Sequence, residues 1–465
     1  MPVVLRLSRG QCHAAHRRMN SNVPEQNLPT VSILPRQKAE ELLQHRDHTH
    51  HHTTIILTMG LPPQGTNERA YLEELSEGGE VLVVVDSKKD TRTGTKWVEA
   101  VARRTQGCPF GHQHAKIVLQ SQRYQGQERV LIIVGTGDFG SSNAVHNNSM
   151  VAYLNLQSGK AQPSTCCGAL VQFLHALELG EPISAASKII SRMVLTLEGC
   201  DFSHLDVVCD FVYSVPRDPT TGANALVTAV RELAATNEIQ YGHSSMGGSP
   251  KSNVTHFLPT FKKLLASACL CPSENVMMVW PPAPAARREL TYCNRCYCAW
   301  NSARPSIREC KRGAGCSVVR CWFRHKSLPA GVGMRECSCI PDDANTLENF
   351  AVFLDETGSS KPTKPSHDGG VHSKFILGLN RTDGRCDVSW LYIGSANASE
   401  AAWGNALRPK NGPFNYEFGV LFKQTAAATR AATSVPWKYA EAERYSHGKM
   451  PIHPEALAAS RVRLK

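Results

Sequence analysis

The sequence contains no long hydrophobic run, and this absence excludes one class of protein at once. Its longest apolar segments, such as Val130–Val134, are far shorter than the roughly 18 residues that a membrane-spanning helix needs. The chain does not open with the apolar core of a secretory signal either, so we expect no disulfide framework and interpret clustered thiols as metal ligands. We therefore expect a protein without membrane spans.

Charged and aromatic residues are scarce, at 20% and 7% of the chain, whereas hydrophobic residues reach 42%. This composition provides material for a sizeable core and excludes wholesale disorder. A length of 465 residues indicates two or three domains, or one large two-lobed domain. The 51 basic and 40 acidic residues leave a net charge of +11, a modest excess that favours a polyanionic partner.

The first 24 residues contain no acidic side chain. We interpret residues 1–52, including the histidine-rich tract His45–His52, as a disordered basic tail. A mitochondrial presequence is the alternative interpretation of this tail. Folded structure is expected from Thr53 onward.

Short runs rich in Val, Ile and Leu predict buried strands, and apolar residues at helical spacing predict helices between them. The expected strands are Ile55–Leu57, Glu80–Asp86, Ala115–Leu119, Arg129–Val134, Asp206–Val215, Lys374–Leu379, Ser389–Ile393 and Glu417–Phe422. The expected helices are Thr95–Arg104, Gly168–Leu179, Ser184–Leu197 and Asn224–Ala235. Strands and helices mixed in this order indicate a layered α/β fold.

Two passages of the sequence repeat each other. The first is His114-Ala-Lys116 followed by a strand pattern and Gly-Thr-Gly-Asp138. The second is His372-Ser-Lys374 followed by a strand pattern and Gly-Ser-Ala-Asn397. The His-to-Asp and His-to-Asn separations are 24 and 25 residues, so unrelated surface His–Lys pairs are a poor explanation.

The repeated spacing has a direct chemical meaning. Alternate residues of a strand share a face, so each histidine and its lysine address one group of substrate atoms. The glycine turns supply backbone donors that suit a phosphate oxygen. Two such units facing each other would surround one phosphate with two imidazoles and two ammonium groups, a set suited to two-step phosphoryl transfer.

These motifs resemble the phospholipase D superfamily, and their details resemble the tyrosyl-DNA phosphodiesterases. Ordinary phospholipase D motifs carry an Asp shortly after the lysine, and the stretches Ile117–Tyr124 and Phe375–Arg381 contain no acid. Further matching blocks are Phe110-Gly111, Ser244-Ser245-Met-Gly247, Ser395-Ala-Asn397-Ala-Ser399-Glu-Ala-Ala-Trp403-Gly404 and Tyr416-Glu417-Phe-Gly419-Val-Leu-Phe422. The resemblance covers residues from about Thr53 to Phe422.

The resemblance implies an α/β fold of two pseudo-symmetric α-β-α lobes with the active site between them. We place the N-terminal lobe at residues 53–200 and the C-terminal lobe at 201–465, with a Cys-rich insertion at about 285–343. It also implies hydrolysis of 3′-phosphotyrosyl DNA, the remnant of a topoisomerase I adduct, and of related 3′ end blocks. No metal or other cofactor would be needed for catalysis.

The family's functional residues carry over by position. His114 would be the nucleophile that forms a phosphohistidine, and His372 the general acid and then the general base. Lys116, Lys374 and Asn397 would hold the phosphate oxygens. The remaining expectations are that Glu417 orients one catalytic histidine and that substrate is bound by Phe110, Ser244, Ser245, Ser395 and Trp403.

Two positions depart from the family. Asp138 stands where the family has Asn, and a carboxylate beside a phosphate is unfavourable unless it is protonated or turned to a lysine. Asn143 is an alternative occupant of that role through a shifted loop. The glutamine that orients the second histidine has no clean match, and Asn147 or Asn148 is the nearest candidate.

The insertion contains a candidate metal site. Cys310, Cys316, Cys321 and His325 follow the spacing C-x5-C-x4-C-x3-H, which suits a closed tetrahedral zinc site and resembles CCCH fingers. Basic and aromatic residues interleaved with them suit single-stranded nucleic acid. A loop with free thiols is the alternative, and a second site built from Cys293, Cys296, Cys337 and Cys339 is a weaker prediction.

Two other functions remain open from the sequence alone. A phospholipase D-like nuclease or lipase would use the same histidines, although the missing acids and the basic charge argue against a lipid substrate. A catalytically impaired nucleic-acid-binding protein would follow if Asp138 disables the site. For the leading function we expect a monomer that binds DNA, localises to the nucleus and has no membrane partner; a mitochondrial location is the alternative.

Overall fold

The computed structural model describes most of two large sheets and the helices around them. The described residues are 31–48, 50–62, 66–86, 97–102, 112–140, 148–157, 162–177, 179, 184–233, 236–243, 258–271, 275–279, 288–293, 318–323, 339–340, 350–352, 374–404, 412–435, 439–441 and 443–444. Within these ranges no helix is long and apolar enough to cross a membrane.

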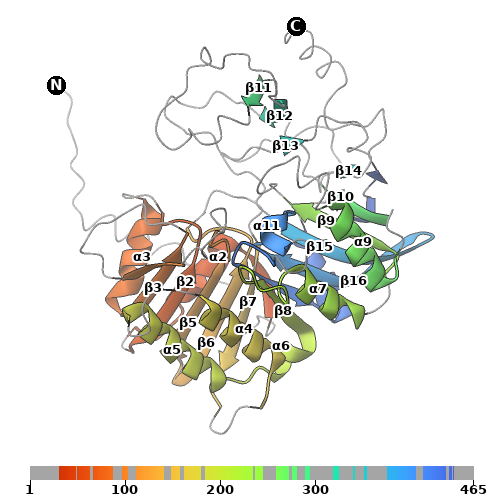
Figure 1. The fold of residues 1–465 in the computed structure, drawn as a ribbon. Coiled ribbons are helices and arrows are strands. Elements are labelled where there is room, and N and C mark those ends of the chain that lie inside the picture. The colour runs from red at the N-terminus through yellow and green to blue at the C-terminus, as the bar shows by residue number, and fades with distance from the viewer. Residues whose placement is uncertain are drawn as a thin grey trace, which may run out of the picture.

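The first sheet is formed by seven strands of the N-terminal part of the chain (Figure 1). They are β1 (Val31–Pro35), β2 (His52–Leu57), β3 (Gly79–Val85), β4 (Val98–Val101), β5 (Ile117–Tyr124), β6 (Gln127–Gly135) and β7 (Asn148–Asn155). Their order is β1-β7-β6-β5-β2-β3-β4. Strands β2, β3 and β4 are parallel to one another, and the other neighbouring pairs are antiparallel.

The second sheet repeats this arrangement. Its strands are β8 (Cys209–Ser214), β9 (Glu238–His243), β10 (Val276–Val279), β14 (Phe350–Val352), β15 (Lys374–Thr382), β16 (Arg385–Gly394), β17 (Glu417–Phe422) and β18 (Glu443–Arg444). Read from β8, the order is β8-β17-β16-β15-β9-β10-β14, with β18 at the edge. Every strand from β1 to β7 therefore has a counterpart with the same neighbours and the same relative directions. The predicted pair of pseudo-symmetric α/β lobes is confirmed.

Helices cover both faces of the sheets and close the core. They are α2 (Arg36–Glu41), α3 (Asn67–Glu77), α4 (Thr165–Ala176), α5 (Ala185–Glu198), α6 (Ser203–Val208), α7 (Ala223–Arg231), α9 (Leu258–Cys269), α11 (Glu400–Trp403) and α12 (Thr425–Ala432), with short 3₁₀ turns at Leu42–Gln44 and Tyr439–Glu441. Helices α4 and α5 begin where the hydroxyls of Ser164 and Ser184 accept backbone N–H groups, as helix N-caps do.

The two lobes share one apolar core. Side chains from both sheets and from α4 and α5 belong to a single buried cluster. Phe173 of α4 contacts Phe418 of β17 with ring centroids 4.9 Å apart, which ties the second sheet to a helix that follows the first one. A second cluster on the opposite face of the first sheet lies under α2 and α3. The position of one lobe relative to the other is thus fixed by buried contacts.

The Cys-rich segment lies between two strands that are neighbours in the second sheet, β10 and β14. Its described parts are β11 (Arg288–Cys293), β12 (Val318–Phe323) and β13 (Cys339–Ile340), which pair only with one another in a three-stranded sheet. Figure 1 shows these strands apart from the two large sheets. This arrangement is what an insertion with its own organisation would give.

Three local predictions are wrong in whole or in part. The strand expected over Asp206–Val215 begins only at Cys209, because residues 206–208 end the helix α6. Residues 31–52 are not a disordered tail: they form β1, α2, a 3₁₀ turn and the start of β2, because β1 completes the first sheet by pairing with β7. The expected helix over Thr95–Arg104 is also absent where the structure describes it, at residues 97–102. That stretch is β4, which pairs in parallel with β3, so tertiary pairing outweighs local helix preference.

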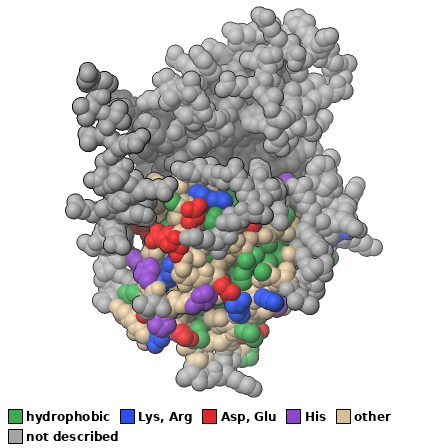
Figure 2. Space-filling view, turned by 90° about the vertical axis from the view of Figure 1, so that its left-hand side faces the viewer, with side chains coloured by type: hydrophobic (Ala, Val, Ile, Leu, Met, Phe, Trp, Pro, Cys, Tyr) green, Lys and Arg blue, Asp and Glu red, His purple; other side chains and the backbone are tan. Residues whose placement is uncertain are grey.

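Figure 2 views the face at the left of Figure 1, which includes α3. Acidic, basic and histidine side chains are interspersed there, and no broad patch of one charge covers the part of this face that is described. The described part of this face therefore carries no concentration of the positive net charge. The candidate site residues His114 and Glu417 lie instead where the two sheets meet.

Candidate active site

His114 lies on an extended segment of the N-terminal lobe that is hydrogen-bonded to the C-terminal lobe. Its backbone N–H donates to the carbonyl of Tyr416 at 3.0 Å, and the N–H of Tyr416 donates to the carbonyl of His112 at 2.9 Å. These bonds make a parallel bridge between Gln113 and Tyr416, just before β5 and β17 begin. The bridge places His114 of one lobe against Glu417 of the other.

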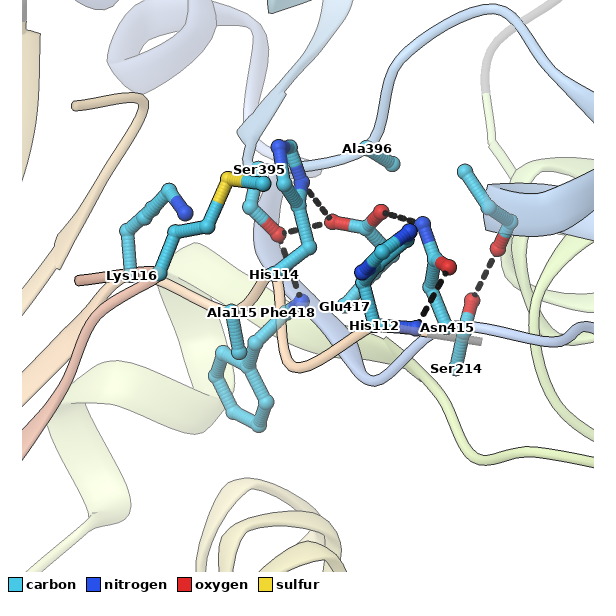
Figure 3. A network of polar contacts seen from close by, with 12 residues as sticks. His112, His114, Ala115, Lys116, Ser214, Ser395, Ala396, Asn415, Glu417 and Phe418 are labelled. Carbon is cyan, nitrogen blue, oxygen red and sulfur yellow. Dashed lines mark hydrogen bonds and ion pairs between the residues drawn. The ribbon is translucent and has the colours of Figure 1, made fainter. Parts of the chain in front are cut away.

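Glu417 receives three side-chain hydrogen bonds in the interior (Figure 3). Its Oε2 lies 2.8 Å from Nδ1 of His114 and accepts a 2.5 Å bond from the Ser395 hydroxyl. Its Oε1 accepts a 2.9 Å bond from Nδ2 of Asn415. The same Ser395 hydroxyl accepts the N–H of Phe418 at 3.0 Å, so the carboxylate is held from several sides. The predicted contact between Glu417 and a motif histidine is present, and the histidine is His114.

The electrostatics of this pair favour a neutral imidazole at neutral pH. Burial is the largest influence on His114 and lowers its pKa; the charge of Glu417 opposes that effect, and the charges of Lys116 and Lys374 add to it, so the pKa is lowered overall. Burial alone raises the pKa of Glu417, but the interactions with His114, Ser395 and Asn415 outweigh it and lower the pKa. With Nδ1 held by Glu417, the second ring nitrogen, Nε2, is the one available for chemistry.

Both motif lysines are fully buried, in line with their place at the head of β5 and β15. The ammonium Nζ of Lys116 lies 2.9 Å from Oδ1 of Asp138. The same Oδ1 accepts the hydroxyl of Thr58 at 3.0 Å and the N–H of Met59 at 2.8 Å. Asp138 is thus turned to the lysine, one of the two arrangements that make a carboxylate acceptable at this position.

Two residues expected at the substrate, Trp403 and Ser395, are buried in this structure. Trp403 is buried among Tyr241, Phe261 and Tyr392, and its indole N–H donates to the hydroxyl of Tyr241 at 2.9 Å. The side chain of Ser395 is fully buried and engaged by Glu417 and Phe418. In this structure Trp403 completes the core and Ser395 positions Glu417, and their contact with substrate stays a prediction. Asn397 is buried in the turn after β16.

Several predicted residues lie outside the described part of the chain. These are His372, Phe110, Ser244, Ser245, Asn143 and, in the zinc motif, Cys310, Cys316 and His325. Cys321 lies on β12, where the backbone is described. Within the described ranges no group of three or more His, Cys, Asp or Glu side chains could hold a metal ion. The zinc site stays a prediction.

A family model for tyrosyl-DNA phosphodiesterase matches residues 68–454, which is most of the chain. The chain belongs to this family. As a tyrosyl-DNA phosphodiesterase it is a DNA-repair enzyme of the phosphodiesterase class, and the predicted activity is confirmed at that level. The duplicated motifs are therefore those of an enzyme family.

Solved structures agree with the fold of a tyrosyl-DNA phosphodiesterase. A crystal structure of a histidine-to-asparagine mutant of the yeast tyrosyl-DNA phosphodiesterase matches with a TM-score of 0.53 and 15% identity, over 90% of this chain and 97% of that one. A histidine-to-arginine mutant of the yeast enzyme matches with a TM-score of 0.53 and 15% identity, over 84% and 89%. Comparison with curated proteins finds no match.

The pseudo-symmetry of this tyrosyl-DNA phosphodiesterase bears on its missing glutamine. Thr136 donates its N–H to the carbonyl of Asn148, just as Ser395 donates to the carbonyl of Phe418. Asn148 is therefore the counterpart of Phe418, and position 147 is the counterpart of Glu417. The side chain of Asn148 also donates to the carbonyl of Ser434 at 2.6 Å. The register thus favours Asn147 over Asn148, although residue 147 itself is not described.

Some residues of the site carry no recognisable motif. Asn415 bonds Glu417 through Nδ2 and accepts the N–H of His112 through Oδ1 at 3.1 Å. The side-chain amide of Gln113 donates to the carbonyl of Ala115 and accepts the N–H of the same residue, so it fixes the chain just before β5. Only the alternation of Asn415 and Glu417 before and in a strand could have indicated a shared face. The bonds from His114 to Glu417 and from His112 to Asn415 join the two lobes, which no local pattern reveals.

Proposed function

We propose that His114 is the nucleophile of the phosphodiesterase reaction and that Glu417 orients and stabilises it. The observation that supports this most is the 2.8 Å contact between Nδ1 of His114 and the buried carboxylate of Glu417. It leaves Nε2 as the nitrogen able to attack, while the lowered pKa keeps that nitrogen unprotonated near neutral pH. Attack makes the ring cationic, and a fixed carboxylate at Nδ1 stabilises the charge as it forms.

The proposed reaction has two steps. Nε2 of His114 bonds to the phosphorus of a 3′-phosphotyrosyl link as the bond to the tyrosyl oxygen breaks, and His372 gives that oxygen its proton. Water then attacks the phosphohistidine while His372 takes its proton, which releases a DNA 3′-phosphate and free His114. We assign Lys116, Lys374 and Asn397 to the phosphate oxygens, where ammonium and amide donors stabilise developing negative charge. We propose that no metal takes part.

The test is turnover of a 3′-phosphotyrosyl oligonucleotide in EDTA, beside a plain oligonucleotide and a phosphatidylcholine vesicle. The proposal expects release of the tyrosyl group with EDTA present and no hydrolysis of the lipid. Release that stops with EDTA contradicts metal-independent chemistry. Hydrolysis of the lipid instead would support the phospholipase-like alternative, and binding without turnover of any substrate would support the impaired DNA-binding protein.

Three finer points belong to the same proposal. We propose that the protein acts as a nuclear monomer on single-stranded 3′ ends, and that the motif formed by Cys310, Cys316, Cys321 and His325 holds a structural zinc ion. Thiolate and imidazole ligands in a closed shell leave no open position for a reacting water, so such an ion would stabilise the insertion rather than act on phosphate. Metal analysis of the purified protein, beside a Cys316→Ser variant, tests the zinc directly.

We further propose that Asn147 supports His372 as Glu417 supports His114. The support is the matched register of β7 and β17, which makes position 147 the equivalent of 417. An Asn147→Ala variant is expected to slow hydrolysis of the phosphohistidine more than its formation, because His372 acts as the base in that step. An Asn148→Ala variant is the matched control, and a larger effect at 148 than at 147 would overturn the assignment.

A further inference from the structure

A third histidine stands beside the proposed nucleophile and has its own carboxylate. Nδ1 of His112 lies 2.9 Å from Oδ2 of Asp86, which directly follows β3. The other oxygen of Asp86 accepts the N–H of Gln113 at 3.0 Å, and the N–H of His112 donates to Asn415. The ring is thus fixed on one side by a buried acid, and its backbone is fixed by the network around Glu417. The motif that predicts the active site does not include His112.

His112, His114 and Lys116 form a row. The bridge to Tyr416 shows that this segment is extended, and alternate residues of an extended chain share a face about 6.6 Å apart. The exposed fraction of the side chain falls along the row, from 39% for His112 to 9% for His114 and 0% for Lys116. His112 therefore lies at the open end of a row whose buried end holds the lysine. Figure 3 shows its ring close to Asn415 and Glu417.

We propose that His112, held by Asp86, binds the DNA phosphate next to the scissile one on its 5′ side. This proposal rests on the assignment of His114 as nucleophile. In an in-line attack, the leaving tyrosyl group lies on the side of the phosphorus opposite His114. His112, which is next to His114, is therefore distant from the peptide that carries the tyrosyl group. His112 can instead reach the DNA strand, which stays bonded to the phosphorus during the first step.

The chemistry of the pair fits a phosphate. A protonated imidazole donates from both nitrogens, so Nδ1 can bond Asp86 while Nε2 donates outward to an anion. His112 and His114 are two positions apart along an extended chain, with only Gln113 between them, and this spacing is similar to that of successive phosphates in a stretched strand. The row would then hold two consecutive phosphates of one strand in register, and this would favour oligonucleotide ends over isolated nucleotides.

The experiment compares two substrates that differ in one charge. Both are dinucleotides with a 3′-phosphotyrosyl end; one has a natural phosphodiester between its nucleosides and the other a neutral methylphosphonate. The ratio of their kcat/KM values is expected to be about tenfold in the wild type, the value of one charge-assisted hydrogen bond. In His112→Ala this ratio is expected to fall to about one. In Asp86→Asn, which keeps an acceptor for Gln113, it is expected to fall part of the way.

A matched control comes from the chain itself. His50 and Asp47 form another partly exposed pair, 3.2 Å apart, before β2 and thus at the opposite end of that strand from Thr58. His50→Ala is expected to keep the wild-type ratio. The proposal is overturned if His112→Ala keeps the wild-type ratio, or if the wild-type ratio is itself about one. It is also overturned if the effect of His112→Ala depends on the length of the peptide attached to the tyrosyl group and not on the charge of the internucleotide link. Turnover of the natural dinucleotide by the wild type tests the proposed function separately, because it does not depend on the ratio.

Discussion

Replacing Glu417 by Gln should slow the chemical step while leaving the fold in place. The carboxylate accepts bonds from His114, Ser395 and Asn415. An amide has one acceptor oxygen, so its NH₂ group must face at least one of these donors. Asn415 cannot turn to relieve this without losing its bond to the N–H of His112. The variant therefore loses both the charge that stabilises cationic His114 and the bond network that orients it.

The size of the effect follows from the kind of bond that is lost. A hydrogen bond to a charged group contributes about 1.5–3 kcal/mol. Because this charge matters most once the histidine has attacked, the loss should appear in kcat as a decrease of about 10- to 150-fold, with KM changed little. Glu238→Gln is the control, since its partner is Arg381 and it begins β9, at the far end from Lys374.

The pH profile gives an independent check of the same variant. Glu417 raises the pKa of His114 against the effect of burial, so removing its charge lowers that pKa further. The acidic limb of kcat/KM, which reports the free enzyme, should therefore move to lower pH in Glu417→Gln. Steady-state kinetics from pH 4 to 8 would measure this. An acidic limb that moves to higher pH, or a kcat equal to that of Glu238→Gln, would refute the reasoning.

Three further variants test separate parts of the structure. Asp138→Asn removes a negative charge beside Lys116 and should lower KM for the anionic substrate about threefold to tenfold; an unchanged or higher KM in steady-state assays counts against this. Burial lowers the pKa of His52 from 6.5 to about 4, so the unfolded chain binds the proton more readily. The contribution of neutral His52 to the free energy of unfolding is fully present above pH 6.5 and falls by up to about 3 kcal/mol toward pH 4. Urea unfolding at several pH values should show this loss in the wild type and not in His52→Gln. Trp403→Phe loses the hydrogen bond to Tyr241 and should lower the free energy of unfolding by about 2 kcal/mol, with KM unchanged. A raised KM would support a contact between Trp403 and substrate.

The elements that sequence reasoning predicts best are those with contiguous apolar residues. Strand β17 has its predicted bounds, and β15 and β16 extend the predicted strands by a few residues. The duplicated motif indicates the two lobes because both copies keep a histidine, a lysine and a glycine turn in the same order. What fails is structure that depends on distant pairing: β1 exists because it pairs with β7, and β4 because it pairs with β3.

The active site divides in the same way. Glu417 is predictable because it stands in a block that resembles the family, and Asp138 turned to Lys116 is one of two arrangements that electrostatics allows. The parts that could not be predicted depend on contacts between residues far apart in the sequence. The N–H of His112 meets Asn415 across the lobe boundary, and the ring of His112 meets Asp86 within the N-terminal lobe. The burial of Trp403 among other aromatic rings is likewise not apparent from its family block, which gives no sign of the packing around it.

The phosphohistidine is the central claim, and its position on the chain is the measurement that tests it most directly. Wild-type protein, His114→Ala and His372→Ala would be incubated with a 3′-phosphotyrosyl oligonucleotide, denatured, digested and analysed by mass spectrometry for a DNA-bearing peptide. The account predicts an adduct on His114 that accumulates in His372→Ala, which lacks the base for hydrolysis, and no adduct in His114→Ala. An adduct on His372, or one that persists in His114→Ala, would contradict it.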